Sequence, residues 1–576
     1  MLFLLSLASA TSGFDPNTPA ASFTGVETYT QDGSIRLWSE IERLEDPDHG
    51  FFHQESFNDV TAWPRESEFA PWIDDCFGSQ TPPSWKVLLH VGPSDPVARG
   101  TPILFVPGAG DNGSRGFITL ATHMDLLYRP VFVLTFAHPH GDVFMQAEMI
   151  ADAIARIKAR TGAAQVDLVS HSKGGIASAV YLSNLTGTVW PDSDYNSAGT
   201  RYRGDVRKAV FIATPLGGID TSYRWPNQNL ASTDADSAMA PTSWDSYGFT
   251  DLSDQDFLKD GQDLFPGHRQ LLARQPYPLP GEQFASLGAY ALQIDYYTTY
   301  EGGYGFYSHS DGIDAAIREG GSLIDSLPGI GVDPAVELYL MAGKNPLMPN
   351  GSEQYYTQSF GQVWTDLATS GTDAWGQVLA IITEDVLTGL SFSATDLQGL
   401  AAGKLVLGEI TGESDGLVFT SSALDASALT ARGAEVVATR EADLSHLDLL
   451  YASPITGGLL QDAADQDPLE NGWMTGVGAR YTAEDTIGQV EDWLADPENP
   501  DDTGEPTDDT GTGPTDDTGT QPQDDSATHD SDGVGNDSEA DDGRDPGSCG
   551  CSSATPGAWG SLGLVALGLL VRRRRD

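Results

Sequence analysis

A short motif in the middle of the chain combines residue types suited to nucleophilic catalysis. Residues 170–174 read SHSKG, follow the strand-like run 165–169 and precede the helix-like stretch 176–185. A serine on a tight turn between a strand and a helix is exposed by that turn, and small neighbours allow the sharp bend. The positive end of the following helix favours the negative charge that develops in acyl transfer. We therefore predict that Ser172 is a nucleophile, with a structural turn serine as the alternative.

A serine nucleophile needs a general base, and histidine is the usual one. The histidines that follow Ser172 in the chain are His268, His309, His446 and His529. His529 lies in a polar, acidic segment that cannot form a core. His446 follows a strand-like run at residues 435–438, and a loop after a strand is the position expected for this base. We therefore predict His446 as the base and leave His268 and His309 as pocket or surface residues.

The third member of such a site is a carboxylate that orients the histidine, and it lies between serine and histidine in chain order. Residues 405–407 form a strand-like run, and Glu413 and Asp415 follow it. Asp415 is our prediction for the acid. Glu413 and a surface Asp-Gly turn at this position are the alternatives.

The segments around Ser172 alternate between strand-like and helix-like patterns. Residues 103–106 and 131–134 are short runs of β-branched and aromatic residues. Between residues 145 and 157, apolar residues recur at helical spacing. This alternation predicts an α/β fold with a mainly parallel sheet.

Several stretches of the chain resemble secreted bacterial lipases and esterases of the α/β-hydrolase fold, the class 2 triacylglycerol lipase type. The matching stretches are residues 103–113, 146–175, 210–218, 414–418 and 444–448. The resemblance implies an α/β-hydrolase fold with Ser172, Asp415 and His446 as the catalytic triad. It implies lipid-like esters as substrates and requires no cofactor. Leu216 stands where these enzymes frequently have histidine.

The same resemblance implies an oxyanion hole and a metal site. The oxyanion donors would be the backbone N–H groups of Ala109 and Lys173, although Pro107 replaces the family's histidine. A glycine-rich turn without this role is the alternative for the first donor. In some relatives, the aspartate two residues after the histidine binds structural calcium. Asp448 matches that position and Asp396 is a candidate companion, with an acidic surface loop as the alternative.

The composition argues against nucleic acid as a partner and against stabilisation by disulfide bonds. The 576 residues include 83 acidic and 30 basic ones, a net charge of −53, which disfavours binding to nucleic acid. A hydrophobic fraction of 39% is enough for a large core. Cys76 is the single cysteine before residue 549, so the predicted globular part has no disulfide framework.

The N-terminal part is predicted to be a leader followed by one large enzyme domain. Residues 1–13 resemble a truncated secretory signal peptide, with an apolar run that ends in an A-x-A pattern. Residues 14–495 are assigned to the α/β-hydrolase domain. Residues 221–400, which are rich in aromatic side chains, are predicted to form a cap over an apolar substrate site. Ordinary packing of the cap itself is the alternative for those aromatic residues.

The C-terminal part is predicted to be a stalk and a sorting tail. Residues 496–548 are rich in Pro, Gly, Thr and Asp, a composition typical of an extended, disordered spacer. Residues 549–576 contain a Cys-x-Cys pair, the apolar run 558–571 and four arginines. They resemble the sorting tags of myxobacterial surface proteins (the MYXO-CTERM type). That resemblance implies a sorting protease as a partner and processing near Cys549 or Cys551, with a permanent membrane anchor as the alternative.

These observations favour a secreted or surface-displayed serine ester hydrolase. A polyester depolymerase or an acyltransferase with the same three residues is one alternative. A surface binding protein on an inactive hydrolase scaffold is another, because a fold by itself does not determine activity.

Overall fold

The computed structural model of the chain describes ten stretches and one isolated residue, and the statements below concern these alone. With short gaps inside some of them, they are residues 14–25, 38–47, 71–79, 82–94, 99–184, 201–219, 258–275, 314, 323–345, 414–468 and 474–495.

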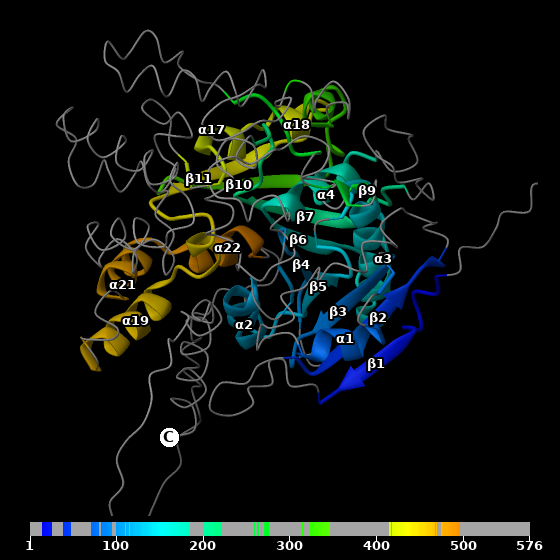
Figure 1. Ribbon diagram of the computed structural model, residues 1–576, viewed down its shortest axis with the longest axis horizontal. Coiled ribbons are helices and arrows are strands. Elements are labelled where there is room, and N and C mark those ends of the chain that lie inside the picture. The colour runs from blue at the N-terminus through cyan, green and yellow to red at the C-terminus, as the bar shows by residue number, and fades with distance from the viewer. Residues whose placement is uncertain are drawn as a thin grey trace, which may run out of the picture.

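A nine-stranded sheet forms the centre of the described part (Figure 1), in the order β1-β2-β3-β5-β4-β6-β7-β10-β11. Its strands are β1 (Ala21–Thr24), β2 (Glu40–Glu45), β3 (Lys86–Val91), β4 (Ile103–Val106), β5 (Val131–Phe136), β6 (Val166–His171), β7 (Val206–Ile212), β10 (Glu337–Gly343) and β11 (Val436–Ala442). The pairs from β5 to β11 are parallel, whereas β1, β2, β3 and β5 pair antiparallel. A small hairpin lies apart from the sheet and consists of β8 (Leu258–Lys259) and β9 (Gln262–Asp263).

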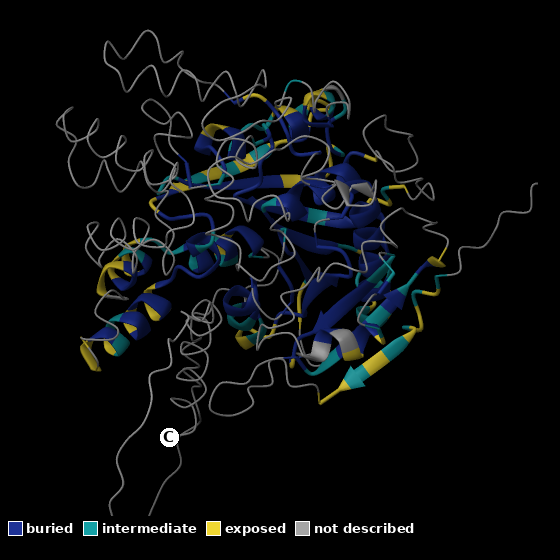
Figure 2. Cartoon of the chain, viewed as in Figure 1, coloured by how far each residue is buried: buried dark blue, intermediate teal, exposed yellow. Residues whose placement is uncertain are grey.

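Helices cover both faces of the sheet. The helices are α1 (Pro71–Phe77), α2 (Ile118–Leu126), α3 (Val143–Thr161), α4 (Lys173–Leu182), α12 (Leu323–Ser326), α17 (Thr420–Ala423), α18 (Ser427–Thr430), α19 (Pro454–Gln466), α21 (Met474–Ala483) and α22 (Thr486–Leu494), with the 3-10 turns η4 (Leu327–Gly329) and η5 (Asp448–Leu450). Figure 1 shows α3 and α4 on one side of the sheet and α2 and α22 on the other. Each side has its own cluster of buried apolar residues, and Figure 2 shows the buried residues concentrated between sheet and helices.

The central strands are buried along their whole length because helices cover both of their faces. Every residue of β4, β5 and β6 is buried. A strand with two buried faces reads as a continuous apolar run rather than as an alternating one. This explains why short apolar runs in the sequence predicted these strands.

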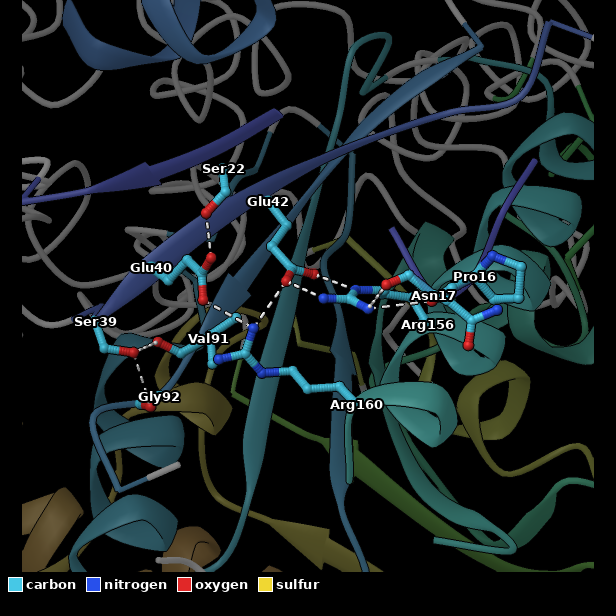
Figure 3. A network of polar contacts seen from close by, with 10 residues as sticks. All are labelled: Pro16, Asn17, Ser22, Ser39, Glu40, Glu42, Val91, Gly92, Arg156 and Arg160. Carbon is cyan, nitrogen blue, oxygen red and sulfur yellow. Dashed lines mark hydrogen bonds and ion pairs between the residues drawn. The ribbon is translucent and has the colours of Figure 1, made fainter. Parts of the chain in front are cut away.

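A network of buried and half-buried charges joins the N-terminal strands to α3 (Figure 3). Arg156 of α3 donates from Nε to the Glu42 carboxylate of β2 at 2.7 Å. One turn further along α3, Arg160 donates to both Glu40 and Glu42 at 2.8 Å. Arg156 also donates to the backbone oxygen of Asn17 at 2.9 Å. The Glu42 side chain is almost fully buried, so removing one partner would leave a buried charge unpaired.

The end of the last described helix is held by cations from the middle of the sheet. Lys208 of β7 donates from Nζ to the backbone oxygens of Trp493 and Ala495, both at 2.9 Å. Arg129 and Arg207 donate to the backbone oxygen of Leu494 at 3.3 and 3.2 Å. The last carbonyls of a helix have no partner within the helix and carry its negative end, so cations stabilise them.

The structure confirms the predicted α/β-hydrolase fold, and it adds a strand that we did not expect. Strand β10 lies between β7 and β11 in the sheet, yet its residues fall inside the range 221–400 that we assigned to a cap. That range is therefore not a cap throughout. The predicted strand at residues 405–407 lies outside the described residues, as do residues 1–13, the stalk and the sorting tail. Within the described stretches, none of the helices is both long and apolar enough to cross a membrane.

Candidate active site

Ser172 occupies a strained turn between β6 and α4. Strand β6 ends at His171, and α4 begins at Lys173. Ser172 itself has φ 51° and ψ −130°, a region that side chains other than glycine rarely adopt. Its backbone N–H donates to Ile212 O at 2.9 Å, and its carbonyl accepts the N–H of Gly175 at 2.9 Å. The turn thus presents a half-buried serine at the end of a central parallel strand.

The two glycines after Lys173 are required by the close packing behind this turn. A Cβ atom on Gly174 would lie 2.3 Å from the backbone oxygen of Pro107. A Cβ atom on Gly175 would lie 2.0 Å from Thr214 Oγ1. The glycines therefore allow the helix that follows Ser172 to pack directly on the loops after β4 and β7.

His446 and Asp415 form a buried acid–base pair. His446 Nδ1 and Asp415 Oδ2 are 2.7 Å apart. The other carboxylate oxygen, Oδ1, accepts the backbone N–H groups of Leu417 and Val418 at 2.9 and 2.7 Å. An ionised carboxylate accepts hydrogen bonds and donates none, so a neutral His446 must carry its proton on Nδ1, where it faces Asp415. The other ring nitrogen, Nε2, is then free to accept a proton.

The main chain of His446 is held from both sides. Its N–H donates to Asp415 O at 2.9 Å, and its carbonyl lies 3.0 Å from His171 Nε2. The His171 and His446 rings pack with their centroids 4.6 Å apart. Burial, and then the neighbouring His446, lower the pKa of His171 well below its usual value, so His171 is neutral. A neutral His171 donates its single ring proton to His446 O. This hydrogen bond holds the base His446 beside His171, which directly precedes Ser172 in the chain.

The loop after β4 lies against the serine turn, as an oxyanion hole requires. A Cβ atom on Gly108 would lie 3.0 Å from Ser172 Cβ. Ala109 follows in this loop and is partly exposed. Lys173 is the first residue of α4, where backbone N–H groups have no acceptor within the helix. The backbone N–H groups of Ala109 and Lys173 are thus in the two segments that flank Ser172, and their role as oxyanion donors remains a prediction.

The Lys173 side chain is buried and tied to α3. Its Nζ donates to Gln146 Oε1, and Gln146 Nε2 donates to the backbone oxygen of His138 at 2.9 Å. Burial lowers the pKa of Lys173 to about 7, while the charge of Asp142 acts in the opposite direction. A lysine that loses its proton this easily makes folding less favourable at every pH where it would be charged in the unfolded chain.

This burial predicts a pH-dependent effect of Lys173→Met. Between about pH 7 and the usual lysine pKa of about 10.4, the unfolded chain binds a proton at Lys173 that the folded chain does not. The wild type therefore gains stability from this group as pH rises through that window, and the variant does not. One pKa unit corresponds to about 1.4 kcal/mol, so we expect the variant's free energy of unfolding relative to wild type to fall by several kcal/mol across the window.

Urea unfolding of both proteins at about pH 6, 8 and 10 measures this difference. Lys158→Met, on the same side of the sheet in α3, is the matched control for a lost lysine side chain. A difference between Lys173→Met and wild type that stays constant with pH would contradict the interpretation.

Asp448, the predicted calcium ligand, lies two residues after His446 and is buried. Its Oδ1 accepts the Tyr481 hydroxyl at 2.6 Å. The part of the chain that the structure describes contains no group of three or more His, Cys, Asp or Glu side chains placed to hold a metal ion. Asp396 lies outside the described residues, as do the alternatives Glu413, His268 and His309.

The structure thus brings together residues that are far apart in the sequence. Asp415 and His446 pair directly, and His171 connects that pair to the turn that carries Ser172. Sequence reasoning missed the contacts made by His171 and Tyr481. The sequence offered one hint for His171, which directly precedes the predicted nucleophile Ser172 in the chain. It offered none for Tyr481.

Comparisons with known proteins find similarity at a low level. No protein-family model matches the chain, and no curated protein matches it in sequence. Among solved structures, a lipase from Bacillus licheniformis in its mature form is 15% identical, with a TM-score of 0.28 over 65% of this chain and 92% of the lipase. A thermostable carboxyl esterase from Bacillus coagulans, solved with glycerol, is 10% identical, with a TM-score of 0.22 over 48% of this chain and 82% of that one.

A monoglyceride lipase from Saccharomyces cerevisiae, a soluble variant with a substrate analogue, is 14% identical. Its TM-score is 0.23, over 47% of this chain and 77% of the lipase. The fold itself rests on the sheet order and on the strand–turn–helix at Ser172.

Proposed function

We propose that this protein is a serine carboxylic-ester hydrolase that acts on lipid-like esters. The observation that carries the proposal is the buried pair of His446 and Asp415, 2.7 Å apart, on loops beside the strained turn of Ser172. Strain of this kind persists only where the surrounding structure enforces it, and such positions cluster at functional sites. A neutral His446 whose Nδ1 proton is held by a carboxylate is ready to take a proton on Nε2.

The reaction proceeds in two halves. Ser172 Oγ attacks the ester carbonyl carbon as its proton passes to His446 Nε2, and the backbone N–H groups of Ala109 and Lys173 stabilise the oxyanion. The bond to the alcohol then breaks, and His446 gives its proton to the leaving oxygen. A water molecule, deprotonated by His446, attacks the acyl carbon of the acyl-enzyme. The bond from that carbon to Ser172 Oγ then breaks, His446 returns the proton to Ser172 Oγ, and the carboxylic acid leaves. Asp415 orients the imidazole and stabilises its cation in both halves.

We also propose that the enzyme is secreted or displayed at the cell surface. The support comes from the sequence of the two ends, namely the apolar run at residues 1–13 and the Cys-x-Cys, apolar and arginine segments of residues 549–576. In this proposal, the acidic residues 496–548 are a spacer between enzyme and envelope, and a sorting protease or a membrane is the partner of the tail.

A panel of p-nitrophenyl esters from acetate to palmitate tests the activity on the full chain. We expect hydrolysis of the longer esters, and we expect a fluorophosphonate to attach to Ser172, detected by mass spectrometry as one added label on the peptide that contains it. Hydrolysis of acetate in preference to palmitate would contradict a lipid-like substrate. If no ester is hydrolysed and no label attaches, the protein is a binding protein on a hydrolase scaffold and the proposal is wrong.

A further inference from the structure

The turn that carries His446 is closed by a reciprocal pair of side chains. Ser445 Oγ accepts the backbone N–H of Asp448 at 3.4 Å, and Asp448 Oδ2 accepts the backbone N–H of Ser445, also at 3.4 Å. This is the arrangement of a capping box, in which two residues three apart satisfy each other's backbone groups. His446 lies inside this box, so Asp448 helps to hold the turn that carries the base, together with the contacts of His446 to Asp415 and His171.

Asp448 is in turn held by the helix α21. Tyr481 of α21 donates its hydroxyl to Asp448 Oδ1 at 2.6 Å, and both side chains are buried. The hydroxyl donates to a buried carboxylate, a type of hydrogen bond that is stronger than one between neutral groups.

The surroundings of Asp448 do not fit a calcium ligand. One carboxylate oxygen accepts the Tyr481 hydroxyl, and the other accepts a backbone N–H and lies 4.0 Å from Arg480 Nη2. Calcium takes six to eight oxygen ligands, commonly with several carboxylates. An ion bound at Asp448 would compete with the Tyr481 hydroxyl for the carboxylate and would lie close to a guanidinium cation, which repels it.

We propose that Tyr481 is a positioning residue that holds the His446 turn through Asp448, in the place of a metal ion. The inference rests on the proposed function, in which His446 is the general base. It gives α21 a role in catalysis although α21 does not contact the substrate. A displacement of the base by about 1 Å is enough to slow the reaction strongly.

Tyr481→Phe tests the proposal, since it removes the hydroxyl and keeps the buried ring. Loss of a hydrogen bond to a charged group predicts a decrease in kcat on the order of 10-fold, with KM unchanged because the substrate is not touched. Tyr339→Phe is the matched control: the Tyr339 hydroxyl also donates to a carboxylate, that of Glu337 at 2.9 Å, but both of these residues lie in β10. Its kcat should stay within about 2-fold of wild type. An active wild type whose kcat is unchanged by Tyr481→Phe would overturn the proposal.

A second arm needs no activity and separates this proposal from the proposed function. The melting temperature of the wild type is measured with EDTA and with CaCl2, and we expect the same value in both. A melting temperature that rises with calcium in the wild type, but not in Asp448→Asn, would show a metal at Asp448 and overturn the proposal. If the wild type hydrolyses no ester, the proposed ester hydrolase function is wrong. The melting temperatures with EDTA and CaCl2 would still show whether a metal binds at Asp448.

Discussion

Ser172→Ala is expected to reduce kcat/KM for every ester in the panel by about 10⁴- to 10⁶-fold, the range found when triad residues are removed from serine hydrolases. The substitution deletes the attacking oxygen and leaves the strained turn to an alanine of nearly the same size. The hydrogen bonds of the turn use only the backbone of Ser172, so folding should be preserved. Steady-state kinetics, together with circular dichroism to check the fold, measure the effect.

Ser170→Ala is the matched control for this experiment. Ser170 lies two residues earlier in β6, is buried, and has its hydroxyl 2.7 Å from that of Ser178. Loss of this contact should lower stability by about 1 kcal/mol and leave the catalytic rate nearly unchanged. If Ser172→Ala retained a tenth or more of the wild-type rate, or if Ser170→Ala lost as much activity, Ser172 would not be the nucleophile.

Asp415→Asn is expected to lower kcat by about 10⁴-fold, as in the corresponding variant of a serine protease, with KM little changed. The reason is the hydrogen-bond pattern around the carboxylate. Oδ1 accepts two backbone N–H groups, so an amide at this position keeps its oxygen there and turns its NH₂ toward His446 Nδ1. His446 must then accept at Nδ1 and carry its proton on Nε2, where it cannot take the proton of Ser172.

The change of tautomer is a direct readout of this prediction. Nitrogen NMR of labelled histidine at a pH where His446 is neutral should show the proton on Nδ1 in the wild type and on Nε2 in the variant. Asp425→Asn serves as the control, because Asp425 Oδ1 accepts the N–H of Ser427 at 3.0 Å in an exposed hydrogen bond that does not involve His446. A decrease of less than 10-fold for Asp415→Asn would point to another acid, with Glu413 the first to test.

The parts of the fold that could be predicted are those in which neighbouring residues carry the signal. Strand β4 has the predicted bounds, and α3 spans the residues whose apolar positions recur at helical spacing. Strand β10 was missed for a topological reason. Residues 344–414 separate it from the acid at Asp415, and in the fold the acid follows the end of β10, where a Cβ atom on Gly343 would lie 2.7 Å from Asp415 Cβ. We expected that strand immediately before the acid and placed it at residues 405–407.

The candidate site also contains residues that local sequence predicts and residues that it does not. Ser172 could be predicted because strand, turn and helix follow one another within a few residues. The contact of His171 with the carbonyl of His446 spans 275 residues, and neither residue's neighbours hint at the other. The bond of Tyr481 to Asp448 similarly depends on where α21 packs, which is a tertiary property that local pattern does not contain.

The cations that hold the end of α22 have a mechanical consequence. The backbone at Trp493, Leu494 and Ala495 is bonded to side chains of Lys208, Arg207 and Arg129, two of which belong to β7 in the interior of the sheet. A pull on the chain beyond Ala495 would therefore load several bonds at once and pass into the most deeply buried strands, instead of unwinding α22 turn by turn. The attachment point is therefore fixed to the sheet itself and not to α22 alone.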